Sequence, residues 1–241
     1  MKERITTGID KLDSLMGGGI PKGNVVILAG GAGAGKSLFC FQFLYKNAKK
    51  GLKSAFISLE ETPKQIIDDA IEAFSDFSDA EDLINKNSLI INGEDILQVI
   101  SNSAFDDTKQ MLYLFNNALA SIYSIILNNN VSVAVIDSVT IFKNLISDPI
   151  SFRLMSMKLI NILKKNNITA LLTLEVSKPY RDFLEFPPEF FIYDGVIGMY
   201  FSSNTDSRIR TLEIVKMRGT SHSTKAFPYE ITSSGIDIVE I

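Results

Sequence analysis

The sequence predicts an α/β fold in which helices flank a mainly parallel, twisted sheet, and three observations support this. Four short apolar runs, at residues 24–29, 54–59, 131–136 and 168–174, have the length and β-branched content of buried strands. Segments with helical periodicity separate these runs, and such alternation is typical of βαβ units. A glycine-rich segment directly follows the first run and leads into the first helix, as in nucleotide-binding folds.

The first half of the chain contains clear start and stop signals. A helix is predicted over residues 36–50, where a glycine ends it. Residues 62–65 (TPKQ) combine an N-cap, a proline suited to the first turn and a glutamine that completes a capping box, so a helix should continue to about Phe74. Residues 75–107 are acidic and irregular, which favours a surface excursion with one short strand at 89–91.

Two more helices are predicted, over residues 111–127 and 148–165. After residue 177 the pattern changes to paired apolar segments around short polar turns, which indicate β-hairpins. These segments lie at residues 195–201, 208–217, 229–232 and 236–241. We therefore expect the last fifth of the chain to add antiparallel strands to the sheet.

Composition sets limits on function. The 241 residues are 46% hydrophobic and 22% charged, which suits a packed structure, and we expect a single domain over residues 1–241. The net charge of −4 argues against a surface that is basic throughout. A single cysteine, Cys40, excludes an intramolecular disulfide and fits a small buried hydrophobe. No apolar run reaches the roughly 18 residues of a membrane span, so a soluble, cytoplasmic protein is expected.

Residues 30–37 (GGAGAGKS) match the P-loop motif G-x-x-x-x-G-K-[ST]. Its glycines let the backbone turn tightly and aim N–H groups at phosphate oxygens, and the positive end of the following helix adds to the anion site. Lys36 should reach the β- and γ-phosphates of ATP, and Ser37 should supply a hydroxyl to Mg²⁺. The nucleotide-binding residues predicted from this motif are Gly31, Ala32, Gly33, Ala34, Gly35, Lys36, Ser37 and Leu38. A glycine-rich turn with an exposed lysine is the simpler alternative, which the flanking strand and helix disfavour.

Acidic residues follow two other predicted strands, at the sheet edge where the P-loop should lie. Asp137 ends the run at 131–136 and is predicted to hold Mg²⁺ with Ser37. Glu60 and Glu61 follow the run at 54–59, where one carboxylate could act as a general base for water. The alternative for this pair is a favourable interaction with the next helix N-terminus, and the chemistry alone leaves the two interpretations equal.

Several blocks resemble, in order along the chain, the KaiC/RadA-like branch of RecA-type ATPases. They are residues 5–13 (ITTGIDKLD), 17–23 (GGGIPKG), the P-loop, 58–61 (SLEE), 136–138 (IDS), 173–175 (TLE), 213–222 (EIVKMRGTSH) and 227–229 (FPY). The resemblance implies a RecA-like P-loop core that assembles side by side, as a hexameric ring or a filament, with ATP between subunits. It also implies that Glu60 and Glu61 form a catalytic carboxylate pair beside Lys36.

The same resemblance gives a role to residues near the C-terminus. Lys216 and Arg218 are implied to act on the ATP of the neighbouring subunit, where a cation neutralises charge that develops on the γ-phosphate. The residues implied to lie near that nucleotide are Lys216, Met217, Arg218, Thr220, Ser221 and His222. Without the resemblance, these would be ordinary exposed cations and a surface histidine.

Three functions remain open at this stage. The first is an oligomeric ATPase that regulates a protein partner. The second is a RadA paralogue that binds single-stranded DNA through a basic, aromatic loop, for which the cluster Lys178, Tyr180, Arg181 and Phe183 is the candidate and an ordinary solvated loop the alternative. The third is an ATP-binding scaffold with little hydrolysis, which the presence of Glu60, Glu61 and Arg218 disfavours.

Overall fold

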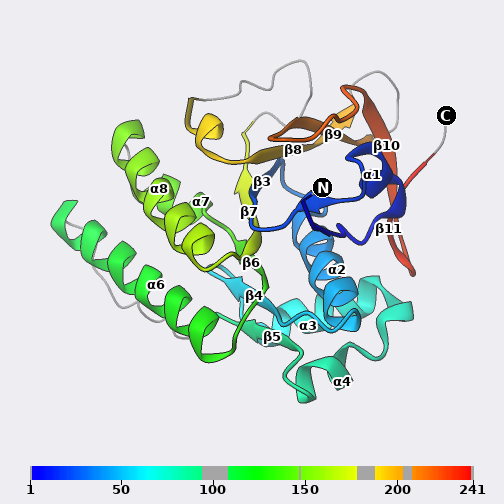
Figure 1. Ribbon diagram of the computed structural model, residues 1–241, viewed down its shortest axis with the longest axis horizontal. Coiled ribbons are helices and arrows are strands. Elements are labelled where there is room, and N and C mark those ends of the chain that lie inside the picture. The colour runs from blue at the N-terminus through cyan, green and yellow to red at the C-terminus, as the bar shows by residue number, and fades with distance from the viewer. Residues whose placement is uncertain (1, 94–107, 147, 178–187, 203–207, 240–241) are drawn as a thin grey trace.

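The computed structural model describes residues 2–93, 108–146, 148–177, 188–202 and 208–239. Its main feature is a large twisted sheet (Figure 1). The strands of this sheet are β3 (Val25–Gly30), β4 (Ser54–Ser58), β5 (Leu89–Asn92), β6 (Val133–Asp137), β7 (Thr169–Glu175), β8 (Gly195–Ser202), β9 (Ile209–Met217), β10 (Ala226–Thr232) and β11 (Gly235–Ile238). In the described part of the chain these nine strands are arranged in the order β11-β10-β9-β8-β3-β7-β6-β4-β5.

Helices cover both faces of the sheet. They are α2 (Lys36–Lys49), α3 (Pro63–Ala73), α4 (Ala80–Asn85), α6 (Thr108–Asn128), α7 (Thr140–Leu145) and α8 (Pro149–Lys165), with short 3₁₀ turns η1 (Ser75–Phe77) and η3 (Pro188–Ile192). Figure 1 shows α6, α7 and α8 on one face and α2, α3 and α4 on the other. A small N-terminal unit of β1 (Arg4–Ile5), α1 (Asp10–Leu15) and β2 (Ile20–Pro21) lies beside β10 and β11. Within the described ranges, no helix is both long and apolar enough to cross a bilayer.

Central strand β3 is buried on both faces, which explains its uninterrupted apolar sequence. Val26 and Leu28 pack in the cluster formed with α2, whereas Val25, Ile27 and Ala29 pack in the cluster formed with α6 and α8. A strand between two helical layers cannot slip by one residue without exchanging these two sets. The position of the loop that follows Gly30 is therefore well fixed.

The predicted fold class is confirmed. The pairs from β5 through β4, β6, β7 and β3 to β8 are all parallel, whereas the pairs β8–β9, β9–β10 and β10–β11 are antiparallel. Both predicted hairpins are confirmed, because β8 pairs with β9 and β10 pairs with β11 in antiparallel orientation. The sequence did not indicate that β8 also pairs with β3 in parallel orientation. Local hydrophobic pattern does not encode which neighbour a strand chooses.

The predicted capping box is confirmed, because the Thr62 side chain accepts a hydrogen bond from Gln65 N and the Gln65 side chain accepts one from Thr62 N. Three short helices, α1, α4 and α7, are absent from the prediction, and α4 lies within the region expected to be irregular. Each has six residues, too few to show a helical period and too few to be stable without packing. Tertiary contacts, not local sequence signals, create them.

Candidate nucleotide site

The loop between β3 and α2 has the backbone shape of a phosphate-binding loop. Gly33 and Gly35 adopt φ of 74° and 85°, in the left-handed region that favours glycine. Gly30 is required for a different reason, since a Cβ atom there would lie 2.7 Å from the Met199 carbonyl oxygen of β8. Because Gly35 has no side chain to cap α2, the N–H groups of the first helical turn are available to an anion.

The hairpin of β10 and β11 packs against this loop and against α2 through hydrogen bonds. The buried Tyr229 hydroxyl of β10 donates a hydrogen bond to the Ala34 carbonyl oxygen within the loop. About two turns into α2, Gln42 accepts a hydrogen bond from Ile236 N at 2.6 Å and donates one to Ile236 O at 3.1 Å. Tyr229 was not predicted as a site residue, and only its place in the FPY block pointed to it.

Lys36 is folded back onto its own loop. Its Nζ donates hydrogen bonds to the carbonyl oxygens of Gly30 at 3.0 Å and Gly31 at 2.9 Å. Burial lowers the pKa of Lys36, although the negative charges of Glu175 and Asp137 act in the opposite direction. Phosphate oxygens are stronger acceptors than these carbonyls, so the ammonium group is placed to exchange them for ATP.

The carboxyl ends of β4 and β6 pair with each other beside the P-loop, at the sheet edge where the sequence predicted them. Ser58 pairs with Asp137 across the two strands, and Leu59 N donates to the Asp137 carbonyl oxygen at 2.7 Å. The Asp137 carboxylate is buried and accepts a hydrogen bond from Thr173 of β7. The sheet thus brings Asp137 to the same edge as Lys36 and Ser37.

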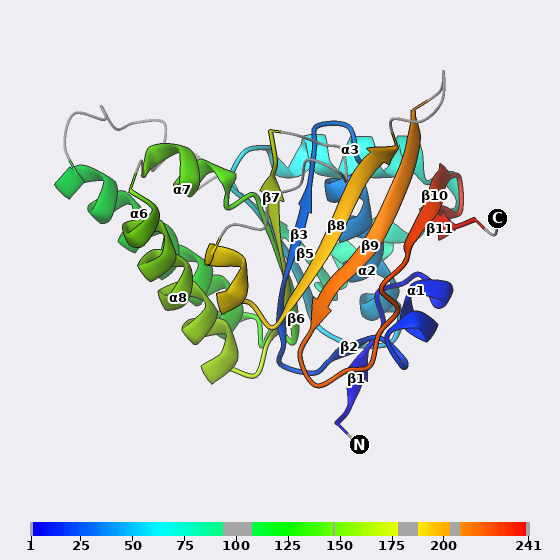
Figure 2. The ribbon, with the colours of Figure 1, turned by 90° about the horizontal axis from the view of Figure 1, so that it is seen from above.

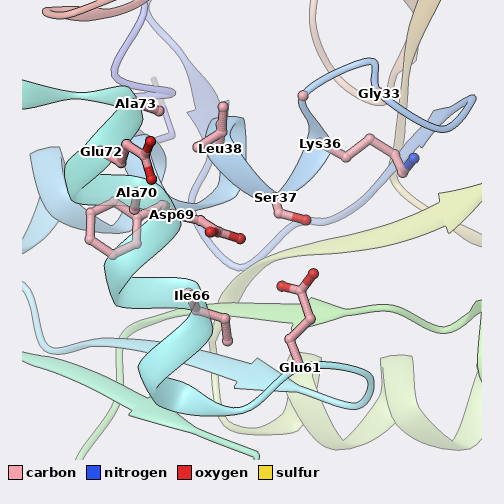
Figure 3. A pocket seen from close by; sticks show the side chains of 12 residues that line it. Gly33, Lys36, Ser37, Leu38, Glu61, Ile66, Asp69, Ala70, Glu72 and Ala73 are labelled. Carbon is pink, nitrogen blue, oxygen red and sulfur yellow. The ribbon is translucent and has the colours of Figure 1, made fainter.

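Glu60 and Glu61 have different environments. Glu60 accepts a hydrogen bond from the Ser138 hydroxyl at 2.8 Å, and burial raises its pKa against the opposing effect of that bond. Burial also raises the pKa of Glu61, helped by the charges of Asp137 and Asp69. The Glu61 carboxylate has no hydrogen-bond partner among the described residues and lines a cavity, where Figure 3 shows it facing Ser37.

Glu175 is a site residue that the prediction missed. It ends β7 opposite Gly30, and its N–H donates to the Thr140 hydroxyl at 2.9 Å. Of the nearby charged groups, the Glu175 carboxylate does most to raise the pKa of Lys36 against the effect of burial. The signal was present in the sequence, since Glu175 directly follows a predicted strand, like Asp137 and Glu60.

The donor set at this edge fits Mg²⁺ bound together with phosphates. The described residues contain no group of three or more His, Cys, Asp or Glu side chains that could hold a metal ion by themselves. Mg²⁺ in phosphoryl-transfer sites is typically bound by one or two protein groups, substrate phosphates and water. Ser37 and Asp137 are the residues here that would hold it.

The predicted residues near the C-terminus lie at the opposite end of the sheet. Met217, the last residue of β9, pairs with Gly195, the first residue of β8. Asp194, just before β8, accepts a hydrogen bond from Val25 N at the start of β3, whereas the P-loop follows the end of β3. Figure 2 shows this end of β9 near β1 and β2, far from α3. The structure therefore separates the predicted site residues into two groups.

Backbone carbonyl groups of η3 and of Tyr193, the residue that follows it, bind the two cations of this second group. Lys216 Nζ donates to Tyr193 O at 2.7 Å and to Phe191 O at 3.2 Å, and Arg218 Nη2 donates to Phe191 O at 2.7 Å. Burial lowers the pKa of Lys216, and the nearby charge of Arg218 adds to this effect. Both cations are thereby oriented at the surface, where Arg218 keeps 52% of its side chain exposed.

Thr220 and His222 follow in the same loop. Arg4 Nη2 of β1 donates to the Thr220 hydroxyl at 3.2 Å, and His222 Nδ1 lies 2.9 Å from the Ser223 carbonyl oxygen. The N-terminal unit thus supports the loop after β9. The candidate DNA-binding cluster at residues 178–183 lies outside the described residues.

Comparison with known proteins identifies the family. The family described as "ATPase: KaiC" matches residues 5–241. The chain belongs to the KaiC family of ATPases. This KaiC-family chain is 30% identical over 240 residues to the circadian clock oscillator protein KaiC of Picosynechococcus, covering 98% of itself but only 44% of that protein. It is 32% identical to a UPF0273 protein of Methanocaldococcus jannaschii, with 97% and 95% of the two chains covered.

A solved structure supports the same relationship. The crystal structure of a KaiC-like protein from Pyrococcus horikoshii matches this KaiC-family chain with a TM-score of 0.79 and 29% identity, and the match covers 100% of both chains. The predicted resemblance is therefore confirmed, as is the RecA-like fold class. ATP binding and the ATPase class follow from family membership.

Proposed function

We propose that this chain hydrolyses ATP at interfaces between its own copies, each of which contributes one part of the site. The 1–241 segment would act as one ATPase domain that assembles into a ring or filament. The observation that carries the proposal is the separation of the two groups of site residues. Five residue steps of about 3.3 Å separate Val25 from Gly30, so about 17 Å of strand lies between Arg218 and the P-loop of the same chain.

Within one subunit, the P-loop amides and Lys36 bind the triphosphate. Mg²⁺ held by Ser37 and Asp137 would offset the charge of the β- and γ-phosphates. Glu60 is the better candidate for the general base, because Ser138 orients its carboxylate and a base held by a third group is typical of activated sites. Its raised pKa favours proton uptake from water.

The neighbouring subunit would supply the missing cations. Lys216 and Arg218 are too far away to reach the ATP bound by their own chain, yet they are partly exposed and oriented by η3. A guanidinium group that arrives only on assembly stabilises charge on the γ-phosphate and couples turnover to association. Met217, Thr220 and His222 would approach the same nucleotide from the loop after β9.

A mixing experiment tests this arrangement. Lys36→Ala removes the P-loop ammonium group but keeps Arg218, whereas Arg218→Ala keeps the P-loop but removes the cation. Each variant alone should hydrolyse little ATP. In a random equimolar mixture one interface in four joins an intact P-loop to an intact Arg218, so about a quarter of wild-type activity should return.

The control replaces one member of the mixture with the double variant Lys36→Ala/Arg218→Ala, which should restore nothing. Full activity of Arg218→Ala alone would refute the shared site. So would a lack of recovery in mixtures that demonstrably co-assemble. Equal, near-zero hydrolysis by the wild type and by Glu60→Gln would instead favour an ATP-binding scaffold.

The charge of the chain bears on what the assembly regulates. A net charge of −4 gives no general attraction to nucleic acid, and binding to phosphate backbones depends on positive charge. A protein whose affinity changes during the ATP cycle is therefore the proposed partner. Retention of labelled single-stranded DNA at low salt would contradict this part of the proposal.

A further inference from the structure

A cavity of about 460 Å³ lies beside the P-loop, and only one side of it suits a nucleotide. That side is formed by Gly33, Gly35, Lys36 and Ser37. The other side is formed by α3 and the start of α2, with apolar residues Leu38, Phe41, Ile66, Ala70 and Ala73 and with carboxylates Glu61, Asp69 and Glu72. In Figure 3, Asp69 projects from α3 toward Ser37, and Glu72 lies further along α3, beside Ala73.

The second side has the wrong charge for phosphate. Three carboxylates repel a polyanion, and the apolar surface between them gives no hydrogen bonds. An apolar surface bordered by negative charge instead fits a group that combines an apolar side chain with cations. A cavity of several hundred Å³ is also large enough to bury an aromatic ring.

Such a group is present at the opposite end of the same chain. Phe191 of η3 is 60% exposed, although it is a large hydrophobic residue. Its ring lies 6.0 Å from Lys216 Nζ, and its carbonyl oxygen accepts hydrogen bonds from both Lys216 and Arg218. These three residues form one surface, which we call the basic–aromatic patch.

The geometry points to a docking contact between two copies of this chain, an inference that rests on the proposed function. Phe191 of one copy enters the cavity of the next and packs against the apolar side formed by α2 and α3. Lys216 and Arg218 then face the carboxylates of Glu61 and Asp69. Because the P-loop forms the other side of the same cavity, this contact brings both cations to the γ-phosphate.

The patch cannot fill the cavity of its own chain. Asp194 follows η3 directly and binds the start of β3, whereas the cavity lies beyond the end of β3. A second copy is therefore the occupant that satisfies both surfaces. The contact extends the proposed catalytic interface and explains why a phenylalanine lies exposed beside two catalytic cations.

Phe191→Ala is the direct test, because it removes the ring but keeps the carbonyl group that orients Lys216 and Arg218. We expect the dissociation constant for assembly with ATP and Mg²⁺ to rise roughly tenfold or more, the factor that burial of most of one phenylalanine side chain provides. Analytical ultracentrifugation over a concentration series measures it. Ile150→Ala is the matched control, since Ile150 of α8 is 68% exposed and lies outside both surfaces.

The cavity side has its own pair of variants. Glu72→Lys places a cation against Lys216 and Arg218 and should weaken assembly, whereas Glu81→Lys on α4 makes the same charge change outside the cavity and should not. Both residues are exposed, so neither change should disturb folding. Equal effects of the two variants would overturn the proposal.

Crosslinking locates the contact. Benzoylphenylalanine at position 191, in a mixture of ¹⁵N-labelled and unlabelled chains, should form adducts between copies on residues 66–73. Adducts elsewhere, or only within one chain, would overturn the docking contact even if the mixture of Lys36→Ala and Arg218→Ala recovers activity. If no assembly forms with ATP and Mg²⁺, both the docking contact and the shared site fail.

Discussion

The hydrogen bond from Tyr229 to the P-loop offers a sharp test of how the C-terminal hairpin supports nucleotide binding. Tyr229→Phe removes only the hydroxyl group, from a side chain that is 3% exposed, and leaves the buried Ala34 carbonyl oxygen without this donor. Loss of one partner of a buried hydrogen bond costs about 1–3 kcal/mol. For a chain of this length each kcal/mol lowers Tm by about 2–4 °C, so a decrease of about 2–12 °C is expected.

ATP affinity should fall as well, because Ala34 belongs to the loop that must hold its shape around phosphate. If ordering the loop around ATP costs the variant about 1 kcal/mol more than it costs the wild type, the dissociation constant rises about fivefold. The kcat value should change little, since Tyr229 does not line the nucleotide cavity. Differential scanning calorimetry and fluorescent-nucleotide titration measure the two effects.

Tyr123→Phe is the matched control, because this tyrosine of α6 is 42% exposed and its hydroxyl can bond to water. It should leave both Tm and ATP affinity unchanged. A Tyr229→Phe variant with wild-type Tm and wild-type affinity would refute the idea that the hairpin positions the P-loop.

Further predictions concern the carboxylates. Glu60→Gln should lower hydrolysis by about 100-fold or more without loss of ATP binding. Glu61→Gln should keep most of the turnover at saturating protein concentration. Equal losses in the two variants would contradict the assignment of Glu60 as the base. A protonated Glu60 cannot accept a proton, so hydrolysis should fall with acid, and because burial raises its pKa the midpoint should lie above the ordinary glutamate value in a pH profile of kcat/KM. Asp194→Asn should lower both Tm and turnover, because it removes the charge that binds Lys164 at 2.7 Å and helps to orient Arg218. A stable, fully active Asp194→Asn variant would show that this ion-pair cluster is dispensable.

Much of the first part of the site could be predicted from sequence, because its signals are local. Glycines, a lysine and a serine in fixed spacing define the P-loop, and acidic residues directly after apolar strands must meet at one sheet edge. The same rule applies to Glu175, which the prediction passed over. The hydrogen bonds that distinguish Glu60 from Glu61 depend on Ser138, far away in sequence, and no local pattern contains them.

The second part could not be derived from local pattern. Lys216 and Arg218 look like any exposed cations until the register of β8 and β9 places them at the end of the sheet opposite the P-loop. Only resemblance to the family suggested their role. The exposed ring of Phe191 had no sequence signal, since a phenylalanine among apolar neighbours is normally expected to be buried.

The positions of the two parts constrain how copies can associate. In a two-fold dimer both copies use the same face, so the P-loop of each copy could meet Arg218 of the other only if both groups lay on that one face. The two groups lie at opposite ends of β3, which favours a head-to-tail contact instead. A head-to-tail contact joins the two different surfaces and leaves one of each unused at the ends of an open chain. An open assembly of n copies therefore has n − 1 complete sites, whereas a closed ring has n. Turnover per subunit should rise with assembly length and reach its full value only when the ring closes, so measuring activity against assembly size would distinguish ring from filament.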